Sequence, residues 1–114
     1  MTDHFSSVSD LIASLNGLKQ EAWIYTNMEF WLSNPQNAGF FYLPWDYMQS
    51  LHDDEVYEDD GVELPLALKD KNLKEWMLVH VLAHIAKSID WNAEGAKEFI
   101  DQVNYYREFD TFKP

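Results

Sequence analysis

The chain has 114 residues and a formal net charge of −12, from 20 acidic and 8 basic side chains. This length suits a single domain, and an aromatic content of 16% argues against an acidic disordered chain. Direct binding to nucleic acid or to an anionic membrane is disfavoured, because both require clustered Lys and Arg. The charge favours a basic protein partner.

The absence of cysteine removes disulfides, Cys-ligated metals and thiol nucleophiles. The first residues contain no basic stretch followed by an apolar run, so no secretory signal is expected. No apolar segment approaches the roughly 20 residues that a membrane span needs. These features predict a cytoplasmic protein without a cofactor.

The charge is unevenly distributed along the chain. Between positions 20 and 68 there is no Lys or Arg, and this segment contains ten of the acids and ten of the eighteen aromatic residues. The segment therefore carries −10 of the total charge of −12. Acidity and aromatic content coincide in the middle of the chain.

The first half of the sequence predicts a helix, two strands and a second, short helix. Apolar residues spaced three and four apart predict a helix over 7–16, with Ser7 as its N-cap. The aromatic and β-branched segments 22–26 and 40–43 are typical of strands that pair with each other. Pro is favoured at a helix start, so a short helix is expected over 45–51.

The second half of the sequence predicts an acidic loop followed by two helices. Seven of the twelve residues in 52–63 are acidic, and such a run is expected to form an exposed loop. Residues 64–68 form a short strand or a connector. Asn72 is a good N-cap for a helix over 73–88, which a last helix over 93–107 follows.

This order of elements predicts an α+β fold. Helix, strands, acidic loop and two further helices suit a small antiparallel sheet packed against three or four helices. We expect one globular domain over residues 1–114.

The pair His80 and His84 is the first candidate for chemistry. Two histidines four residues apart on one helix face can both ligate zinc. A metalloprotease site needs Glu directly after the first histidine, and here Val81 follows His80. Because the surroundings are apolar, the favoured interpretation is two core or half-buried histidines with local hydrogen bonds. A small metal-dependent enzyme using His80 and His84 remains an alternative.

The remaining catalytic and metal-binding motifs are absent from the sequence. With Gly61 at the sixth position of an EF-hand loop, the first and twelfth positions fall on Val56 and Ala67, which excludes that motif. There is no Gly-x-Ser-x-Gly elbow and no glycine-rich phosphate loop. No enzymatic activity and no bound metal are expected.

Recognition of a basic protein fits these features better. Carboxylates steer a basic partner, and Tyr or Trp supplies buried anchors. The candidate partner-binding residues are Asp46, Tyr47, Asp53, Asp54, Glu55, Tyr57, Glu58, Asp59, Asp60 and Glu63. The aromatic residues expected in the core are Trp23, Tyr25, Phe30, Trp31, Phe40 and Phe41.

The acidic stretch 53–61 and the aromatic block 22–44, in a small chain without cysteine, resemble the immunity proteins of bacterial contact-dependent growth inhibition systems. The resemblance implies a cytoplasmic inhibitor that binds the C-terminal domain of a toxin, often a basic nuclease. Carboxylates of 46–63 would then neutralise the toxin by electrostatic and steric occlusion. An alternative is a nucleic-acid mimic that inhibits a nuclease or defence protein, with acids spread over one face at phosphate-like spacing.

Overall fold

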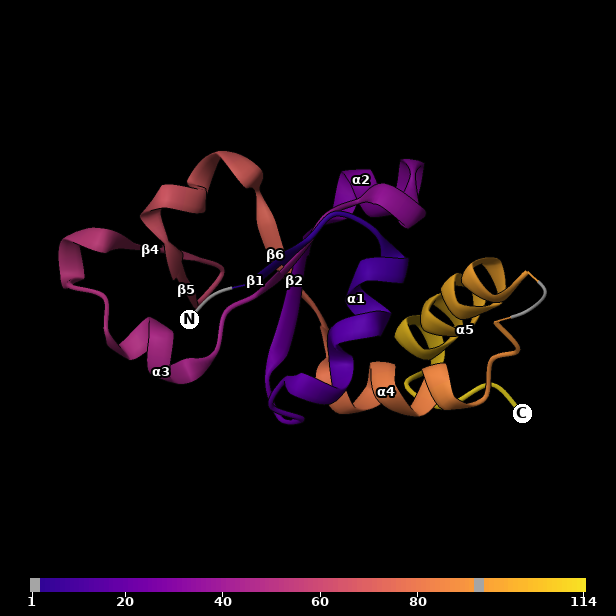
Figure 1. Cartoon of the computed structure of the whole chain (residues 1–114). Coiled ribbons are helices and arrows are strands. Elements are labelled where there is room, and N and C mark those ends of the chain that lie inside the picture. The colour runs from indigo at the N-terminus through magenta and orange to yellow at the C-terminus, as the bar shows by residue number, and fades with distance from the viewer. Residues whose placement is uncertain (1–2, 92–93) are drawn as a thin grey trace.

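A four-stranded antiparallel sheet lies at the centre of the computed structural model, which describes residues 3–91 and 94–114 (Figure 1). Its strands, in spatial order, are β1 (Asp3–Phe5), β3 (Phe40–Tyr42), β2 (Trp23–Asn27) and β6 (Leu73–Leu78). The predicted pairing of 22–26 with 40–43 is confirmed, with Ile24 opposite Tyr42. The predicted α+β fold is also confirmed.

Four helices bury their apolar side chains in the larger of two hydrophobic clusters. They are α1 (Val8–Ser14), α2 (Met28–Ser33), α4 (Val79–Lys87) and α5 (Gly95–Phe109). Sheet and helices meet at Trp31, Phe40 and Trp76, where the Trp76 ring centroid lies 4.8 Å from that of Trp31 and 4.9 Å from that of Phe40. This aromatic contact anchors α2 to the sheet.

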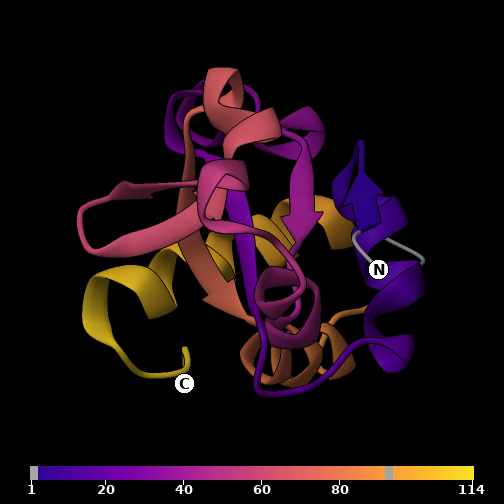
Figure 2. The ribbon, with the colours of Figure 1, turned by 90° about the vertical axis from the view of Figure 1, so that its left-hand side faces the viewer.

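A second layer covers the other face of the sheet. It consists of α3 (Trp45–Gln49) and a separate two-stranded sheet of β4 (Val56–Asp59) and β5 (Val62–Pro65). The smaller hydrophobic cluster lies beneath this layer and contains Tyr25, Leu43, Leu64 and Leu73. Figure 2 views the molecule from this side, with the hairpin and α3 nearest the viewer.

A β-bulge explains how β6 contributes to both clusters. Ile24 pairs with Met77 and Tyr25 pairs with Glu75, so Trp76 is an extra residue on β6. A bulge shifts the alternation of side chains by one residue. Trp76 and Met77 therefore both belong to the larger cluster, whereas Leu73 belongs to the smaller one.

The predicted helix over 73–88 is wrong in its first six residues. Residues Leu73–Leu78 form strand β6, and the helix begins only at Val79. Asn72 is not an N-cap, because its φ of 51° is left-handed and ends a 3₁₀ helix over Leu66–Lys71. The bulge places apolar residues in succession, which imitates helical spacing, and pairing with β2 decides the conformation.

The predicted acidic loop over 52–63 is also wrong. A 3₁₀ turn over Asp53–Glu55 leads into the β4–β5 hairpin. Asp60 and Gly61 form its two-residue turn with φ values of 53° and 81°. A type I′ turn requires positive φ at both central positions, and Asp-Gly is a preferred pair there. This local signal outweighs the repulsion between neighbouring acids.

The remaining helices lie close to their predicted positions. Ser7 caps α1 as predicted, with its Oγ accepting a hydrogen bond from the Asp10 backbone N–H at 3.2 Å. The predicted helices over 45–51 and 93–107 correspond to α3 and α5, and Ala93 lies outside the described residues. No helix among the described residues is both long and apolar enough to cross a membrane.

Candidate partner-binding site

The outer face of the β4–β5 hairpin presents two carboxylates directly opposite each other. Glu58 pairs with Glu63 in the register, and both side chains are exposed. Like charges at opposite positions destabilise a strand pair. No salt bridge neutralises either carboxylate within residues 3–91 and 94–114. The hairpin therefore contains a repulsion that a cationic partner would relieve.

The turn before the hairpin extends this negative surface. Asp53, Asp54 and Glu55 are all exposed. The Glu55 carboxylate accepts a hydrogen bond from the backbone N–H of His52 at 3.0 Å, which fixes the turn. Asp53 and Asp54 make no salt bridge in the described part of the chain. Their charges are open to solvent and to a partner.

Two of the predicted acids have a different role. The ammonium group of Lys74 on β6 lies 2.6 Å from an oxygen of Asp59 and 3.4 Å from one of Asp60. The hydrogen bond to Asp59 is the main cause that raises the pKa of Lys74. These contacts join the tip of the hairpin to the central sheet. Asp59 and Asp60 are therefore already neutralised in part.

Asp46 is also paired. Its carboxylate lies 2.6 Å from the ammonium group of Lys19, and both side chains are at least half exposed. The hydrogen bond from Lys19 lowers the pKa of Asp46 and raises that of Lys19. An exposed pair of this kind contributes little to stability. Its effect is to place one cation at the edge of the acidic surface.

The two candidate tyrosines pack inward. Tyr47 and Tyr57 are half-buried against the smaller hydrophobic cluster. Burial raises the pKa of Tyr57, and the Lys69 ammonium group lies 5.7 Å from the centre of its ring. Tyr57 therefore anchors the hairpin, with only part of its ring available to a partner.

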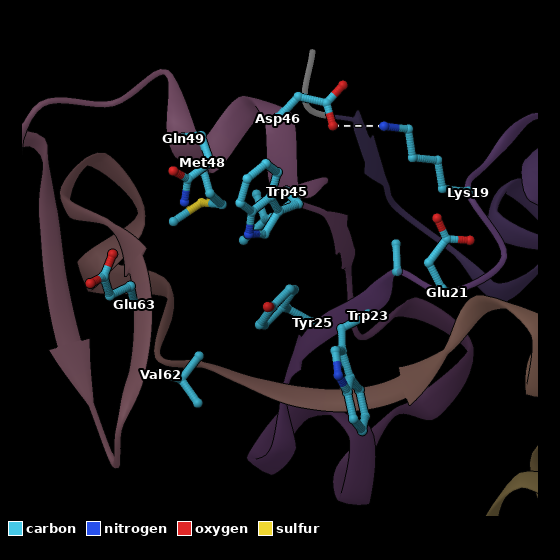
Figure 3. Close-up of a pocket in the computed structure, with 12 residues that line it drawn as sticks. Lys19, Glu21, Trp23, Tyr25, Trp45, Asp46, Met48, Gln49, Val62 and Glu63 are labelled. Carbon is cyan, nitrogen blue, oxygen red and sulfur yellow. Dashed lines mark hydrogen bonds and ion pairs between the residues drawn. The ribbon is translucent and has the colours of Figure 1, made fainter.

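An aromatic cavity lies beside this acidic surface, between the central sheet, α3 and β5 (Figure 3). Its volume is about 490 Å³. The aromatic residues that line it are Trp23, Tyr25 and Trp45, and the acidic residues that line it are Glu21, Asp46 and Glu63. Three elements distant in sequence thus bring rings and carboxylates to one place.

The expected aromatic core is only partly correct. Tyr25, Trp31 and Phe40 are buried and Phe41 is half-buried, but Trp23 is 37% exposed and Phe30 is 56% exposed. Strand alternation places Trp23 on the same face as Tyr25, where it lines the aromatic cavity.

Trp45 is a candidate contact residue that is absent from the residues predicted from the sequence. It is 73% exposed at the first position of α3. Exposure on this scale is unusual for Trp, which is mostly buried in folded proteins. Nothing in the local sequence separates Trp45 from a core tryptophan, since its exposure follows from the packing of α3.

Tyr25 is buried with its hydroxyl directed into the aromatic cavity. The residue is 8% exposed, and burial raises its pKa to about 12. Figure 3 shows the phenolic oxygen pointing into the space between Trp45 and Val62. No side chain or backbone group of the described chain hydrogen-bonds to it. A protonated phenol without a partner is therefore available to a ligand.

His80 and His84 both lie on α4, but both are exposed, so the expectation of core or half-buried histidines is wrong. His80 does have a hydrogen-bond partner, but not a local one: its Nδ1 lies 3.1 Å from the backbone oxygen of Gln20, 60 residues away in the sequence. The His84 ring packs on Phe112 with centroids 4.0 Å apart. Across the described residues, no three acidic or histidine side chains gather as candidate metal ligands.

Comparisons of the chain with protein-family models, curated proteins and solved structures find no match.

Proposed function

We propose that this chain is an immunity protein that binds and neutralises the basic domain of a toxin, with a nuclease as the expected class of toxin. Binding would combine electrostatic attraction with steric occlusion of the toxin surface. The contact surface would be the hairpin, the turn before it and the exposed indole of Trp45. Neutralisation in this form requires no chemistry from the chain itself.

The observation that carries this proposal is the pair Glu58 and Glu63. Two exposed carboxylates face each other across the hairpin without a cation in the described structure. Such a pair costs stability, so its presence needs a compensating benefit. Attraction of a basic partner provides one, because complementary charge accelerates association and raises specificity. Trp45 supplies the adjacent aromatic anchor.

The two alternatives receive less support from the geometry. A nucleic-acid mimic needs acids at regular spacing, whereas Asp59 and Asp60 are paired with Lys74 and Asp46 is paired with Lys19. The metal-dependent enzyme would use His80 and His84, which contact separate neighbours. We therefore retain the immunity function as the proposal.

The test is protection of bacterial growth. Basic candidate toxin domains encoded by neighbouring genes are each expressed from an inducible promoter, with this chain supplied from a second plasmid. We expect the unaltered chain to restore growth and the double variant Glu58→Lys/Glu63→Lys to lose protection. The affinity of the purified pair should fall about tenfold or more, because both charges oppose the partner.

A matched control separates this effect from the loss of net negative charge. The variant Asp101→Lys/Glu108→Lys makes the same change in charge on exposed positions of α5. It should protect as well as the unaltered chain at equal expression. Failure of the unaltered chain to protect, or equal protection by both variants, contradicts the proposal.

A further inference from the structure

We propose that the aromatic cavity between Trp23, Tyr25 and Trp45 receives an arginine side chain of the basic partner. This inference rests on the proposed function, because the arginine is taken to belong to the toxin domain. It specifies a pocket on this chain and the side chain of the partner that would occupy the pocket.

The walls of the aromatic cavity suit a flat cation. In Figure 3 the Trp45 indole lies on one side of the open space and the Tyr25 ring on the other. No ring contact joins the two within the described chain, so the space between them is not closed by stacking. A guanidinium stacks on aromatic faces and is attracted by their quadrupoles. Insertion between the rings would also cover the exposed indole.

The Tyr25 hydroxyl gives the aromatic cavity a polar floor. Its ring is more than nine-tenths buried, and its oxygen has no hydrogen-bond partner in the described structure. Among the described residues, Trp76 Nε1 is the only buried side-chain polar atom without a partner, so the Tyr25 oxygen is reached by solvent in the cavity. An entering ligand can replace water as its hydrogen-bond partner. A guanidinium carries five N–H donors, and the phenolic oxygen can accept from one of them.

The charges at the rim favour a cation over a neutral ligand. Glu21 and Glu63 line the aromatic cavity, and neither makes a salt bridge among the described residues. Asp46 also lines it, but its charge is balanced by Lys19. The Glu21 carboxylate thus remains for an incoming positive charge, and Glu63, whose side chain lies on the outer face of the hairpin, adds negative charge at the margin of the cavity. Arg pairs with such carboxylates more readily than Lys, because its guanidinium is planar and more weakly hydrated.

The size of the aromatic cavity agrees with a side chain that enters together with its backbone. The volume of about 490 Å³ lies within the range of about 300–1,000 Å³ that is typical of ligand pockets. A capped tripeptide is therefore a suitable probe. The backbone flanking the arginine would contact Met48 and Gln49 of α3, which line the same cavity.

The experiment titrates the ¹⁵N-labelled full chain with acetyl-Gly-Arg-Gly-amide and follows amide and indole signals by NMR. We expect saturable shifts at the indole N–H groups of Trp23 and Trp45. The same peptide with citrulline in place of arginine keeps the shape but lacks the charge. It should bind about fivefold to tenfold more weakly, the loss that a desolvated cation–π contact predicts.

Three variants locate the binding site. Trp45→Ala and Tyr25→Phe should each weaken binding of the arginine peptide about fivefold. Leu32→Ala serves as the control, because Leu32 is 77% exposed on α2 and does not line the cavity. Equal binding of the citrulline peptide, or unchanged binding by Trp45→Ala, overturns the inference.

The growth assay distinguishes this inference from the proposed function. If the unaltered chain protects against the toxin and the arginine peptide does not bind, the aromatic cavity is not an arginine site and the proposed function stands. If the peptide binds but the chain protects against no toxin domain, the proposed function fails, and with it the assignment of the arginine to a toxin.

Discussion

Tyr25 illustrates how much a single side chain depends on its environment. Its position in an aromatic segment predicts a buried ring, and the ring is buried. The same burial holds its pKa at about 12, above the ordinary value of 10. The free hydroxyl, in contrast, follows from the arrangement of α3 and β5 above it. The sequence therefore predicted that the ring is buried, whereas the packing of α3 and β5 determined that its oxygen is open to a ligand.

The raised pKa of Tyr25 predicts a loss of stability at alkaline pH. The native state prefers the neutral phenol, so this contribution is complete below pH 10 and is lost as the pH rises from 10 to 12. The free energy of unfolding should fall by about 2–3 kcal/mol relative to Tyr25→Phe over this range. Urea unfolding at several pH values measures the difference. Parallel curves for the two proteins would contradict the assignment.

A second prediction at this scale concerns the contact between Trp31 and Asn104. The indole N–H of Trp31 donates to Oδ1 of Asn104 at 3.0 Å, and Trp31 is almost completely buried. Asn104→Ala should lower the free energy of unfolding by about 1–2 kcal/mol, because a buried donor loses its partner. Asn104→Asp keeps an acceptor and serves as the control in denaturant unfolding. A fully stable Asn104→Ala protein would show that this hydrogen bond contributes nothing.

At the scale of elements, the hairpin β4–β5 shows which local signals decide a conformation. Seven acids in twelve residues predict a solvated loop, yet Asp60-Gly61 encodes a tight turn with positive φ at both positions. Tyr57 and Leu64 pair on the inner face and pack on the smaller cluster. Both the Asp60-Gly61 turn signal and this apolar pair are present in the sequence. The run of acids nevertheless favoured the prediction of a loop.

The turn predicts different effects of alanine at two glycines. Gly61 has a φ of 81°, so Gly61→Ala should destabilise the protein by about 1–2 kcal/mol although no atom obstructs the new methyl group. Gly17 is equally unobstructed and lacks a positive φ, so Gly17→Ala should be neutral or slightly stabilising. Thermal unfolding of both variants makes the comparison. Equal melting temperatures would contradict the turn assignment.

In the helix predicted over 73–88, by contrast, a distant strand pairing overrides the local signal. Its apolar spacing fits a helix, but Leu73–Leu78 pairs with β2 and carries a bulge. Pairing partners lie about fifty residues away, so the local pattern contains no trace of them. The second half of the segment, α4, has no such partner strand and adopts the predicted helix.

At the scale of the whole molecule, one sheet separates two clusters of unequal size. The helices cover one face, and the hairpin with α3 covers the other (Figures 1 and 2). The layer over the smaller cluster carries Asp46 and the acids of 53–63, the most acidic stretch of the chain. Charge is thus concentrated at one end of a molecule with extents of 46 × 27 × 24 Å.

This concentration of charge predicts a response of stability to salt. A net charge of −12 destabilises the compact state by self-repulsion, and salt screens that repulsion. The melting temperature should therefore rise as NaCl increases from about 0.01 M to about 0.15 M. The variant Glu58→Lys, which places a cation opposite Glu63 and so removes the cross-strand repulsion, should respond less. A melting temperature independent of salt would contradict this account.

The sequence by itself determined the fold class, the pairing of the two aromatic strands and the location of the acidic surface. These features depend on composition and on local periodicity, which do not require knowledge of distant contacts. Only the tertiary structure decided which acids are neutralised by Lys74 and Lys19, and which tryptophans face solvent. The aromatic cavity belongs to this second group. It is built from β2, α3 and β5, and their meeting depends on how the layers pack rather than on any one segment.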